Sequence, residues 1–189
     1  EYIDRKDIKH IPRFVETCLD IDSYELLMAK CVDEGLFTMC TPFDEESVPL
    51  IQNMGFDAIK IASCSVSDRP LLARIAEAKM AVVASTGGAT VPEIEYVVHL
   101  LRKHEMDVAL EHCVSIYPTP EDKLQLNQIE FLKNHFKGVP IGWSTHEDPN
   151  DFITVKLATA KGATLFERHI GVETDSYRLN AYSSTPEQI

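Results

Sequence analysis

Six polar clusters, each directly after an apolar, β-rich segment, dominate the sequence between Phe37 and Ile170. A helix-like stretch follows each time, and the clusters read MCTPFD, IKIASCS, VVASTGG, LEHCVSIYPTP, IGWSTHED and LFERHIG. Parallel strands that are covered on both faces read as near-continuous apolar runs, and in barrels built from such strands the chemistry lies where the strands end. The pattern therefore predicts that the functional residues lie in these six clusters.

The connecting segments carry the signals of amphipathic helices. Over residues 24–34 apolar residues recur at helical spacing and Gly35 follows, which predicts a helix with a glycine stop. Thr90 and Glu93 predict a capping box at the start of another helix, and Asp68 can cap a third. These signals predict that strands and helices alternate along the chain.

One further helix is expected near the end of the pattern, where Ile153, Leu157 and Ala160 precede Gly162. Their spacing predicts that this apolar stripe faces the core. No linker, low-complexity tract or charge block interrupts the series, so we expect a single domain over residues 1–189.

Strands that alternate with helices at intervals of roughly 22 to 32 residues predict an α/β fold of parallel β-α units with right-handed crossovers. About six such units are present, two fewer than in a closed (β/α)8 TIM-type barrel. Two architectures are open: an open doubly wound sheet, or a barrel of which this chain holds about six units. Residues 1–21 read as a loop-like lead-in, which favours the partial barrel.

Composition excludes several classes of function. A formal net charge of -12 disfavours nucleic-acid binding. The sequence has no run of eighteen apolar residues and no apolar signal-peptide core, so we expect neither membrane insertion nor secretion. The five cysteines form no CxxC pair, so neither a disulfide framework nor a structural zinc site is expected. A reducing cytoplasm fits this pattern best.

Strand alternation places Lys60 on one face with the small residues Ala58 and Ala62, which suits the interior of a barrel. Glu111 falls on the same interior face, deeper down, where it can pair with Lys60. From the residues alone, a structural ion pair and the binding of an anionic ligand are equally good interpretations of Lys60.

The same alternation brings two histidines to the interior face, His146 with Ser144 on one strand and His169 with Glu167 on the next. Two imidazoles on adjacent strands can converge on one metal ion, although each alone is more often a hydrogen-bonded structural residue. The sequence therefore predicts a candidate metal site.

Hydroxyl groups are expected near the ends of the strands. Thr41 and Ser85 line the interior, and Ser115 and Tyr117 join them where their strand leaves the barrel. Thr41, Ser63 and Ser85 can instead cap the turns that follow them.

Taken together, six runs of residues occur in the order found in the sialic acid synthase family, which the chain resembles from about Leu36 to Ile170. The runs are TPFD, KIAS, ASTGG, YPTP, STHED and ERH. The resemblance implies a (β/α)8 barrel that condenses phosphoenolpyruvate with an N-acetylated amino-sugar such as N-acetylmannosamine. It also implies a nine-carbon 2-keto acid and phosphate as products.

Carried over by position, the resemblance implies that His146 and His169 bind a divalent metal, Mn²⁺ or Mg²⁺, that activates the aldehyde of the sugar. It implies that Lys60 holds the phosphoenolpyruvate anion and that Tyr117 contacts the sugar. Glu167 precedes the second of these histidines on the interior face, from where it could orient a metal-bound water. The hydroxyl groups that it places around the substrate belong to Thr41, Ser63, Ser85 and Ser144, and the strand-end residue Ser115 is a further candidate.

The chain also departs from the family pattern. Ser65 stands where a glutamate is usual, Ser115 replaces an asparagine, Thr145 an aspartate and Arg168 a lysine. The stretch Leu179, Asn180 and Ala181 replaces a Pro-Asp-His sequence, and no C-terminal antifreeze-like domain is expected. The identity of the sugar is therefore open.

Two alternative functions are consistent with the residues. Lys60 could form a Schiff base in a metal-independent aldolase, or the chain could be a non-catalytic carbohydrate-binding relative of a synthase. The expected partners are small molecules, not nucleic acid or membrane. An incomplete barrel exposes a strand edge, so further strands or a partner chain, a homodimer being one form, are expected to cover it.

Overall fold

The computed structural model describes residue 8 and residues 11–189. Contacts within the chain group it into two compact units, Glu1–Thr38 and Met39–Ile189, where the sequence predicts a single domain. The division follows from the helical character of residues 11–33, which make contacts of their own. We describe each unit by itself.

The first unit contains two helices, α1 (Ile11–Glu16) and α2 (Ile21–Asp33). The expectation of a loop over residues 1–21 is therefore wrong for residues 11–16, and residues 1–7, 9 and 10 lie outside the described part. Asp20 begins α2, because its side chain accepts a hydrogen bond from the backbone N–H of Ser23 at 2.9 Å. Gly35 follows with a φ of 69°, as the predicted glycine stop requires.

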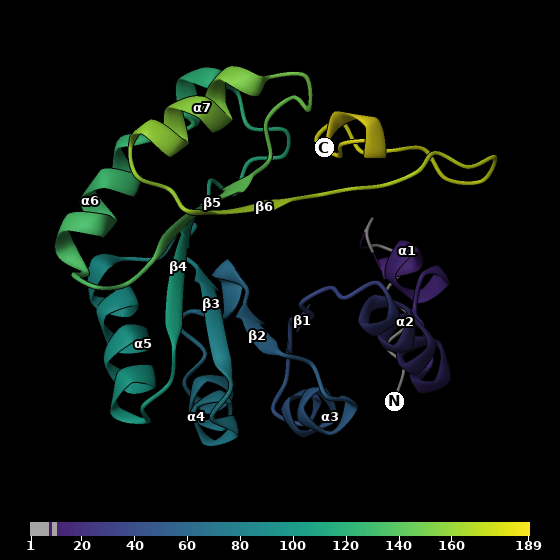
Figure 1. The fold of residues 1–189 in the computed structure, drawn as a ribbon, viewed down its shortest axis with the longest axis horizontal. Helices are drawn as coiled ribbons and strands as arrows, with labels where there is room; N and C mark the ends of the chain where they lie inside the picture. Colours follow the sequence, from purple (N-terminus) through teal and green to yellow (C-terminus); the bar gives the residue numbers. More distant parts are fainter. Residues whose placement is uncertain (1–7, 9–10) are drawn as a thin grey trace. The chain divides into compact units, whose positions relative to one another are not determined.

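The second unit is a six-stranded parallel sheet whose strands lie in chain order, with helices α3 to α7 on its outer face (Figure 1). The strands are β1 (Met39–Cys40), β2 (Ala58–Ile61), β3 (Ala81–Ser85), β4 (Val108–His112), β5 (Ile141–Thr145) and β6 (Leu165–Arg168). The helices are α3 (Ser47–Met54), α4 (Arg69–Ala78), α5 (Val91–Lys103), α6 (Asn127–His135) and α7 (Phe152–Ala160), with short 3-10 turns η1 (Ser63–Ser65), η2 (Glu121–Lys123) and η3 (Pro186–Gln188).

Sequential strand order excludes the doubly wound alternative, because such a sheet reverses its order at a switch point. The sheet curls into a half-barrel. In a flat sheet β2 and β6 would lie about 19 Å apart, at roughly 4.8 Å per strand, yet the side chains of Lys60 on β2 and Glu167 on β6 are in contact. Within the described residues, β1 and β6 each pair with one strand only.

Register separates the two faces of the sheet as strand alternation predicts. Ile59 and Ile61 are fully buried against the helices, and their neighbours along the register, such as Val82 and Leu110, share that apolar layer. The interior face carries Lys60 and the polar residues beyond it. The apolar core therefore lies between the sheet and the helices, and the polar groups gather inside the curl.

Gly142 makes room for one of these polar groups. A Cβ at this position would lie 2.8 Å from Cγ of Glu111 and 2.8 Å from Cβ of Leu165, closer than packed side chains allow. The absence of a side chain on β5 therefore lets the stem of Glu111 cross the interior face.

The predicted helix starts are confirmed. The backbone N–H and the hydroxyl of Thr90 both donate to Glu93, each at 2.7 Å, in a capping box at the start of α5. Asp68 begins α4 by accepting a hydrogen bond from the N–H of Leu71 at 3.1 Å.

Helix α7 corrects one expectation. Ile153 and Leu157 are 68% and 49% exposed, and the buried residues of α7 are Thr154 and Ala158. The orientation of α7 follows from its cap, because Asp151 accepts hydrogen bonds from the hydroxyl and the backbone N–H of Thr154 and so holds that side chain inward. Ala158 lies one turn later on the same face of the helix and is also buried.

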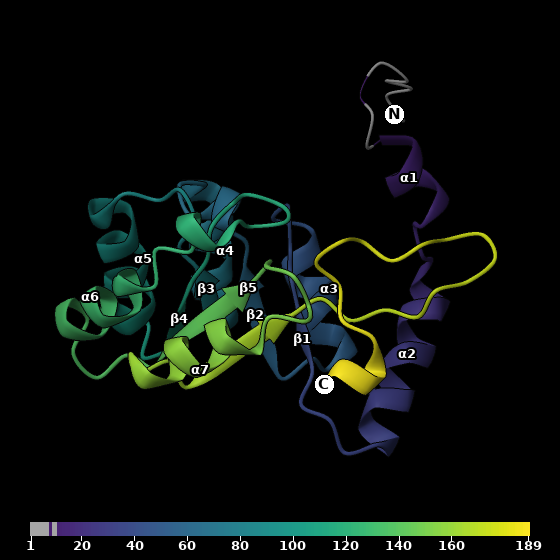
Figure 2. The same ribbon diagram turned by 90° about the horizontal axis from the view of Figure 1, so that it is seen from above.

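After β6 the chain leaves in a long loop and then returns (Figure 2). The backbone N–H of Ser184 donates to the carbonyl of His169 at 2.8 Å, and the N–H of Gly171 donates to the carbonyl of Ser184 at 3.0 Å. These two bonds form a parallel bridge between Ile170 and Ser184. The tail therefore ends beside the carboxyl end of β6.

No helix formed by the described residues has the length and apolar character that crossing a bilayer requires.

The cap of α4 gives a first testable prediction. Replacing Asp68 with alanine leaves the N–H of Leu71 without its partner, so we expect the free energy of unfolding to fall by about 1 kcal/mol. Asp68→Asn, which keeps an acceptor oxygen, should lose less. Urea unfolding of both variants checks this, and equal losses would contradict the assigned cap.

Candidate active site

A buried lysine held between two carboxylates lies at the centre of the interior face. The Nζ of Lys60 is 3.0 Å from Oε2 of Glu111 and 2.5 Å from Oε1 of Glu167. The hydroxyl of Ser144 donates to Oε2 of Glu167 at 2.6 Å. The predicted pair of Lys60 and Glu111 is thus confirmed, and Glu167 joins it from the far side of the curl.

Burial and charge act in opposite directions on these groups. Burial disfavours the ammonium form of Lys60, but attraction to Glu111 and Glu167 outweighs it and raises the pKa of the lysine. Burial raises the pKa of Glu111, which is 3% exposed, despite the nearby ammonium. The more exposed Glu167 has a lowered pKa, because the attraction of Lys60 and the hydrogen bonds from Lys60 and Ser144 outweigh its burial.

Four aromatic rings lie together at the strand ends. The ring centroids of His146 and His169 are 5.5 Å apart, and Tyr117 lies 4.3 Å from His146. Tyr182, from the returning tail, lies 5.0 Å from His169 and 5.5 Å from Tyr117. The structure therefore brings the two predicted histidines and the predicted tyrosine together and adds a second tyrosine.

The two histidines fit two positions of one metal ion. Imidazoles that share an ion through bonds of about 2.1 Å place their centroids roughly 5 Å apart, close to the separation found here. The Nδ1 of His146 lies 3.3 Å from the carbonyl oxygen of Val114, the kind of support that leaves Nε2 of a metal-binding histidine free. Burial lowers the pKa of His146, which favours the neutral form that binds metals.

Two ligands do not complete a coordination sphere. Among the side chains that the structure describes, no three His, Cys, Asp or Glu groups are arranged to hold one ion. The remaining ligands would have to be water, substrate or groups outside this set.

Two hydroxyl groups and a thiol, from the loops after β2 and β4, meet around Gly87 on the loop after β3. A Cβ on Gly87 would lie 2.6 Å from Sγ of Cys113, 2.9 Å from Oγ of Ser115 and 3.1 Å from Oγ of Ser63. Ser63 and Cys113 are themselves 3.3 Å apart. The structure therefore brings the predicted residues Ser63 and Ser115 together, and glycine is needed for the approach.

Two further predicted residues lie at strand ends. Ser85 is buried at the end of β3, in register with Glu111. Thr41 follows β1 directly and is half-buried. Substrate contacts of both residues stay predictions.

Two departures from the family pattern lie on the opposite face. Thr145 and Arg168 are register partners on β5 and β6, facing away from Ser144 and Glu167. Arg168 lies 3.9 Å from the buried carboxylate of Glu147, and burial raises the pKa of Glu147. These two departures therefore act in the packing of the outer layer and do not line the interior.

The tail residue Tyr182 is the site residue that sequence reasoning missed. It lies in a segment without strand or helix periodicity, so no alternation assigns it a face. The one available signal is its position just after Leu179, Asn180 and Ala181, where the tail departs from the family sequence.

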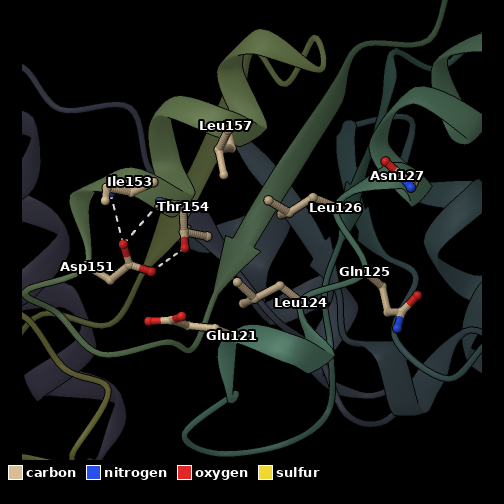
Figure 3. A pocket seen from close by; sticks show the side chains of 9 residues that line it. All are labelled: Glu121, Leu124, Gln125, Leu126, Asn127, Asp151, Ile153, Thr154 and Leu157. Atoms are coloured by element: carbon tan, nitrogen blue, oxygen red, sulfur yellow. Dashed lines mark hydrogen bonds between the residues drawn. The ribbon is translucent and has the colours of Figure 1, made fainter.

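A pocket of about 410 Å³ lies outside the curl, between α7 and the segment from η2 to the start of α6 (Figure 3). None of the predicted site residues lines it. Of its two acidic residues, Glu121 and Asp151, Asp151 caps α7 by accepting hydrogen bonds from the backbone N–H groups of Ile153 and Thr154. We therefore place the candidate active site inside the curl.

The fold and the interior site define a barrel-type α/β protein whose polar residues gather where parallel strands end. A model of the NeuB family matches residues 4–188. The chain belongs to the NeuB family.

Individual relatives agree with this assignment. A solved structure from Chromobacterium violaceum, assigned provisionally to spore coat polysaccharide biosynthesis, is 48% identical with a TM-score of 0.95, covering 98% of this chain and 55% of that one. The N-acetylneuraminic acid synthetase of Leptospira borgpetersenii, solved with citrate, is 30% identical with a TM-score of 0.83, covering 90% and 59%. N-acetylneuraminate-9-phosphate synthase of Drosophila melanogaster is 33% identical over 80% of this chain and 41% of its own length. The chain thus spans about half the length of the proteins it matches.

The lysine and its two carboxylates give the second prediction. Lys60→Met leaves Glu111 buried without a counter-charge, so we expect a loss of about 3–5 kcal/mol in the free energy of unfolding at pH 7. A carboxyl whose pKa is raised on folding stabilises the fold at low pH and loses that contribution as the pH rises. The deficit should therefore be smaller at pH 5, where Glu111 can take up a proton.

The control for this prediction is the double variant Lys60→Met/Glu111→Gln, which removes both buried charges. It should be more stable at pH 7 than Lys60→Met alone, because Glu167 remains 38% exposed and solvated. A double variant as unstable as Lys60→Met alone would show that the loss of stability does not come from the buried, unpaired charge of Glu111.

Proposed function

We propose that this chain forms the interior site of an enzyme that condenses phosphoenolpyruvate with an N-acetylated amino-sugar, giving a sialic-acid-type 2-keto acid and phosphate. The observation that carries the proposal is the juxtaposition, at the strand ends of a NeuB-family half-barrel, of Lys60 and its carboxylates with the His146–His169 pair. Several relatives are named as synthases of N,N'-diacetyllegionaminic acid, N-acetylneuraminate 9-phosphate and pseudaminic acid, which supports the reaction class.

We propose that the complete catalytic unit is a (β/α)8 barrel. The curl of β1 to β6 and their open ends support this, because further strands pairing with β1 and β6 would close the sheet. A homodimer remains a candidate for covering the open ends.

A divalent ion held by His146 and His169, Mn²⁺ or Mg²⁺, would act as a Lewis acid toward the sugar aldehyde. The C=C electrons of phosphoenolpyruvate would form the new bond from its methylene carbon to the aldehyde carbon, and the aldehyde oxygen would take up a proton and become a hydroxyl group. Water would add at C2 of the former phosphoenolpyruvate and lose a proton. The C2–O bond to phosphate would then break, with the C2 hydroxyl proton passing to the departing phosphate, which leaves the 2-keto group. Glu167, held by Lys60 and Ser144, is placed to accept a proton from that water.

Anion binding needs more than Lys60 alone, since two carboxylates already share its charge. The ammonium, Glu111 and Glu167 carry a net negative charge when both glutamates are ionised. We propose that Lys60 contacts phosphoenolpyruvate while it keeps Glu167 in place, and that hydroxyl groups supply further hydrogen bonds. These groups belong to Thr41, Ser63, Ser85, Ser115 and Ser144, and we assign the sugar side to Tyr117.

The Schiff-base alternative has less support from the geometry. A nucleophilic lysine must be a neutral amine, and the two carboxylates raise the pKa of Lys60, which favours the ammonium. Borohydride in the presence of substrate should therefore leave Lys60 unmodified.

The proposal is tested with the product of the complete reading frame that encodes this chain. Phosphate should appear only when phosphoenolpyruvate, an N-acetylated amino-sugar and Mn²⁺ are all present, and chelation should abolish it reversibly. His146→Ala should lower the turnover rate at least 100-fold, while Tyr177→Ala, an exposed tail position, should retain it. Binding of a singly or doubly N-acetylated sugar without phosphate release would instead favour the non-catalytic relative.

A further inference from the structure

We propose that Tyr182 is a positioning residue that holds the imidazole of His169 in the orientation in which it binds the divalent ion. This inference rests on the proposed function for the presence of the ion. It assigns a role to a residue outside the six strand-end clusters.

The contact between the two rings is specific in geometry. Tyr182 and His169 meet at 5.0 Å between centroids and 82° between planes, an edge-to-face arrangement. Such contacts are among the favoured arrangements of aromatic pairs and restrict rotation of the rings. Tyr182 also meets His146 at 6.0 Å and 90°, so one ring touches both candidate ligands.

His169 needs such support more than His146 does. His146 is buried and its Nδ1 lies within hydrogen-bonding distance of the Val114 carbonyl oxygen. His169 follows the end of β6 and is exposed. Among the interactions described above, the contacts with neighbouring aromatic rings are therefore the ones that restrain the His169 imidazole.

The backbone fixes Tyr182 in this place. Ser184, two residues later, donates to the carbonyl of His169 itself, and Gly171 donates back to Ser184. Ser183 and Ser184 are buried, and the side chain of Gln188 donates to Asn150 at 2.8 Å on the loop after β5. The tail is thus anchored to the same two loops that carry the histidines, which holds Tyr182 beside them.

The test measures Mn²⁺ affinity by electron paramagnetic resonance, independently of turnover, on the product of the complete reading frame. Tyr182→Leu and Tyr182→Ala should weaken Mn²⁺ binding about three- to tenfold, the range expected for one aromatic contact. Tyr182→Phe, which keeps the ring edge, should bind within twofold of the unaltered protein. Tyr177→Ala removes a tyrosine from the exposed part of the same tail and should also leave the affinity unchanged.

A double-mutant cycle shows whether Tyr182 acts through His169. In a His169→Ala background the change Tyr182→Leu should have no further effect on Mn²⁺ affinity. Equal affinity for Tyr182→Leu and the unaltered protein, or a loss that persists without His169, would overturn the proposal. If Tyr182→Ala fails to fold, the comparison of Mn²⁺ affinity between Tyr182→Leu and Tyr182→Phe still decides whether the aromatic ring is needed.

Failure of the inference and failure of the proposed function give different results. Mn²⁺ binding that is insensitive to Tyr182, with phosphate release intact, refutes only the role of Tyr182. Absence of Mn²⁺ binding to the unaltered protein overturns the inference, and the phosphate assay then decides separately whether the condensation stands.

Discussion

The contact between Lys60 and Glu167 is the interaction on which the rest of the structure depends. It joins β2 to β6, which a flat sheet would hold too far apart for any pair of side chains, so it exists only because the sheet curls. The same contact needs Glu111, whose charge helps to keep a buried ammonium stable, and Gly142, whose missing side chain makes space for Glu111. Curvature, charge balance and glycine placement are therefore parts of one arrangement.

That arrangement also organises the chemistry next to it. Glu167 lies two residues before His169, and Ser144, which donates to Glu167, lies two residues before His146. Because alternate residues of a strand share a face, fixing Glu167 and Ser144 also fixes the direction in which the two histidines leave their strands. The Lys60 ion pairs and the hydrogen bond from Ser144 to Glu167 therefore hold the two strand residues from which the candidate metal-binding histidines follow.

Much of this could be predicted from alternation and capping. The interior face, the pair of Lys60 and Glu111, the shared face of the histidines and the caps at Asp68 and Thr90 follow from local spacing, and the structure agrees. Local spacing does not indicate the helix at residues 11–16. It also predicts the wrong buried side of α7, because the apolar Ile153 and Leu157 are larger than the buried Thr154 and Ala158. Tyr182 could not be predicted, since its position depends on long-range backbone hydrogen bonds that leave no periodic pattern in the sequence.

The central claim is that the interior of this half-barrel, at the ends of β5 and β6, is a divalent metal site beside the Lys60 ion pairs. The most direct measurement is an anomalous difference map at the manganese absorption edge, from crystals of the complete reading-frame product soaked in Mn²⁺ and phosphoenolpyruvate. The account predicts one strong peak within bonding distance of both His146 and His169, with phosphoenolpyruvate beside Lys60. A manganese peak elsewhere, with those two imidazoles left unliganded, would contradict it.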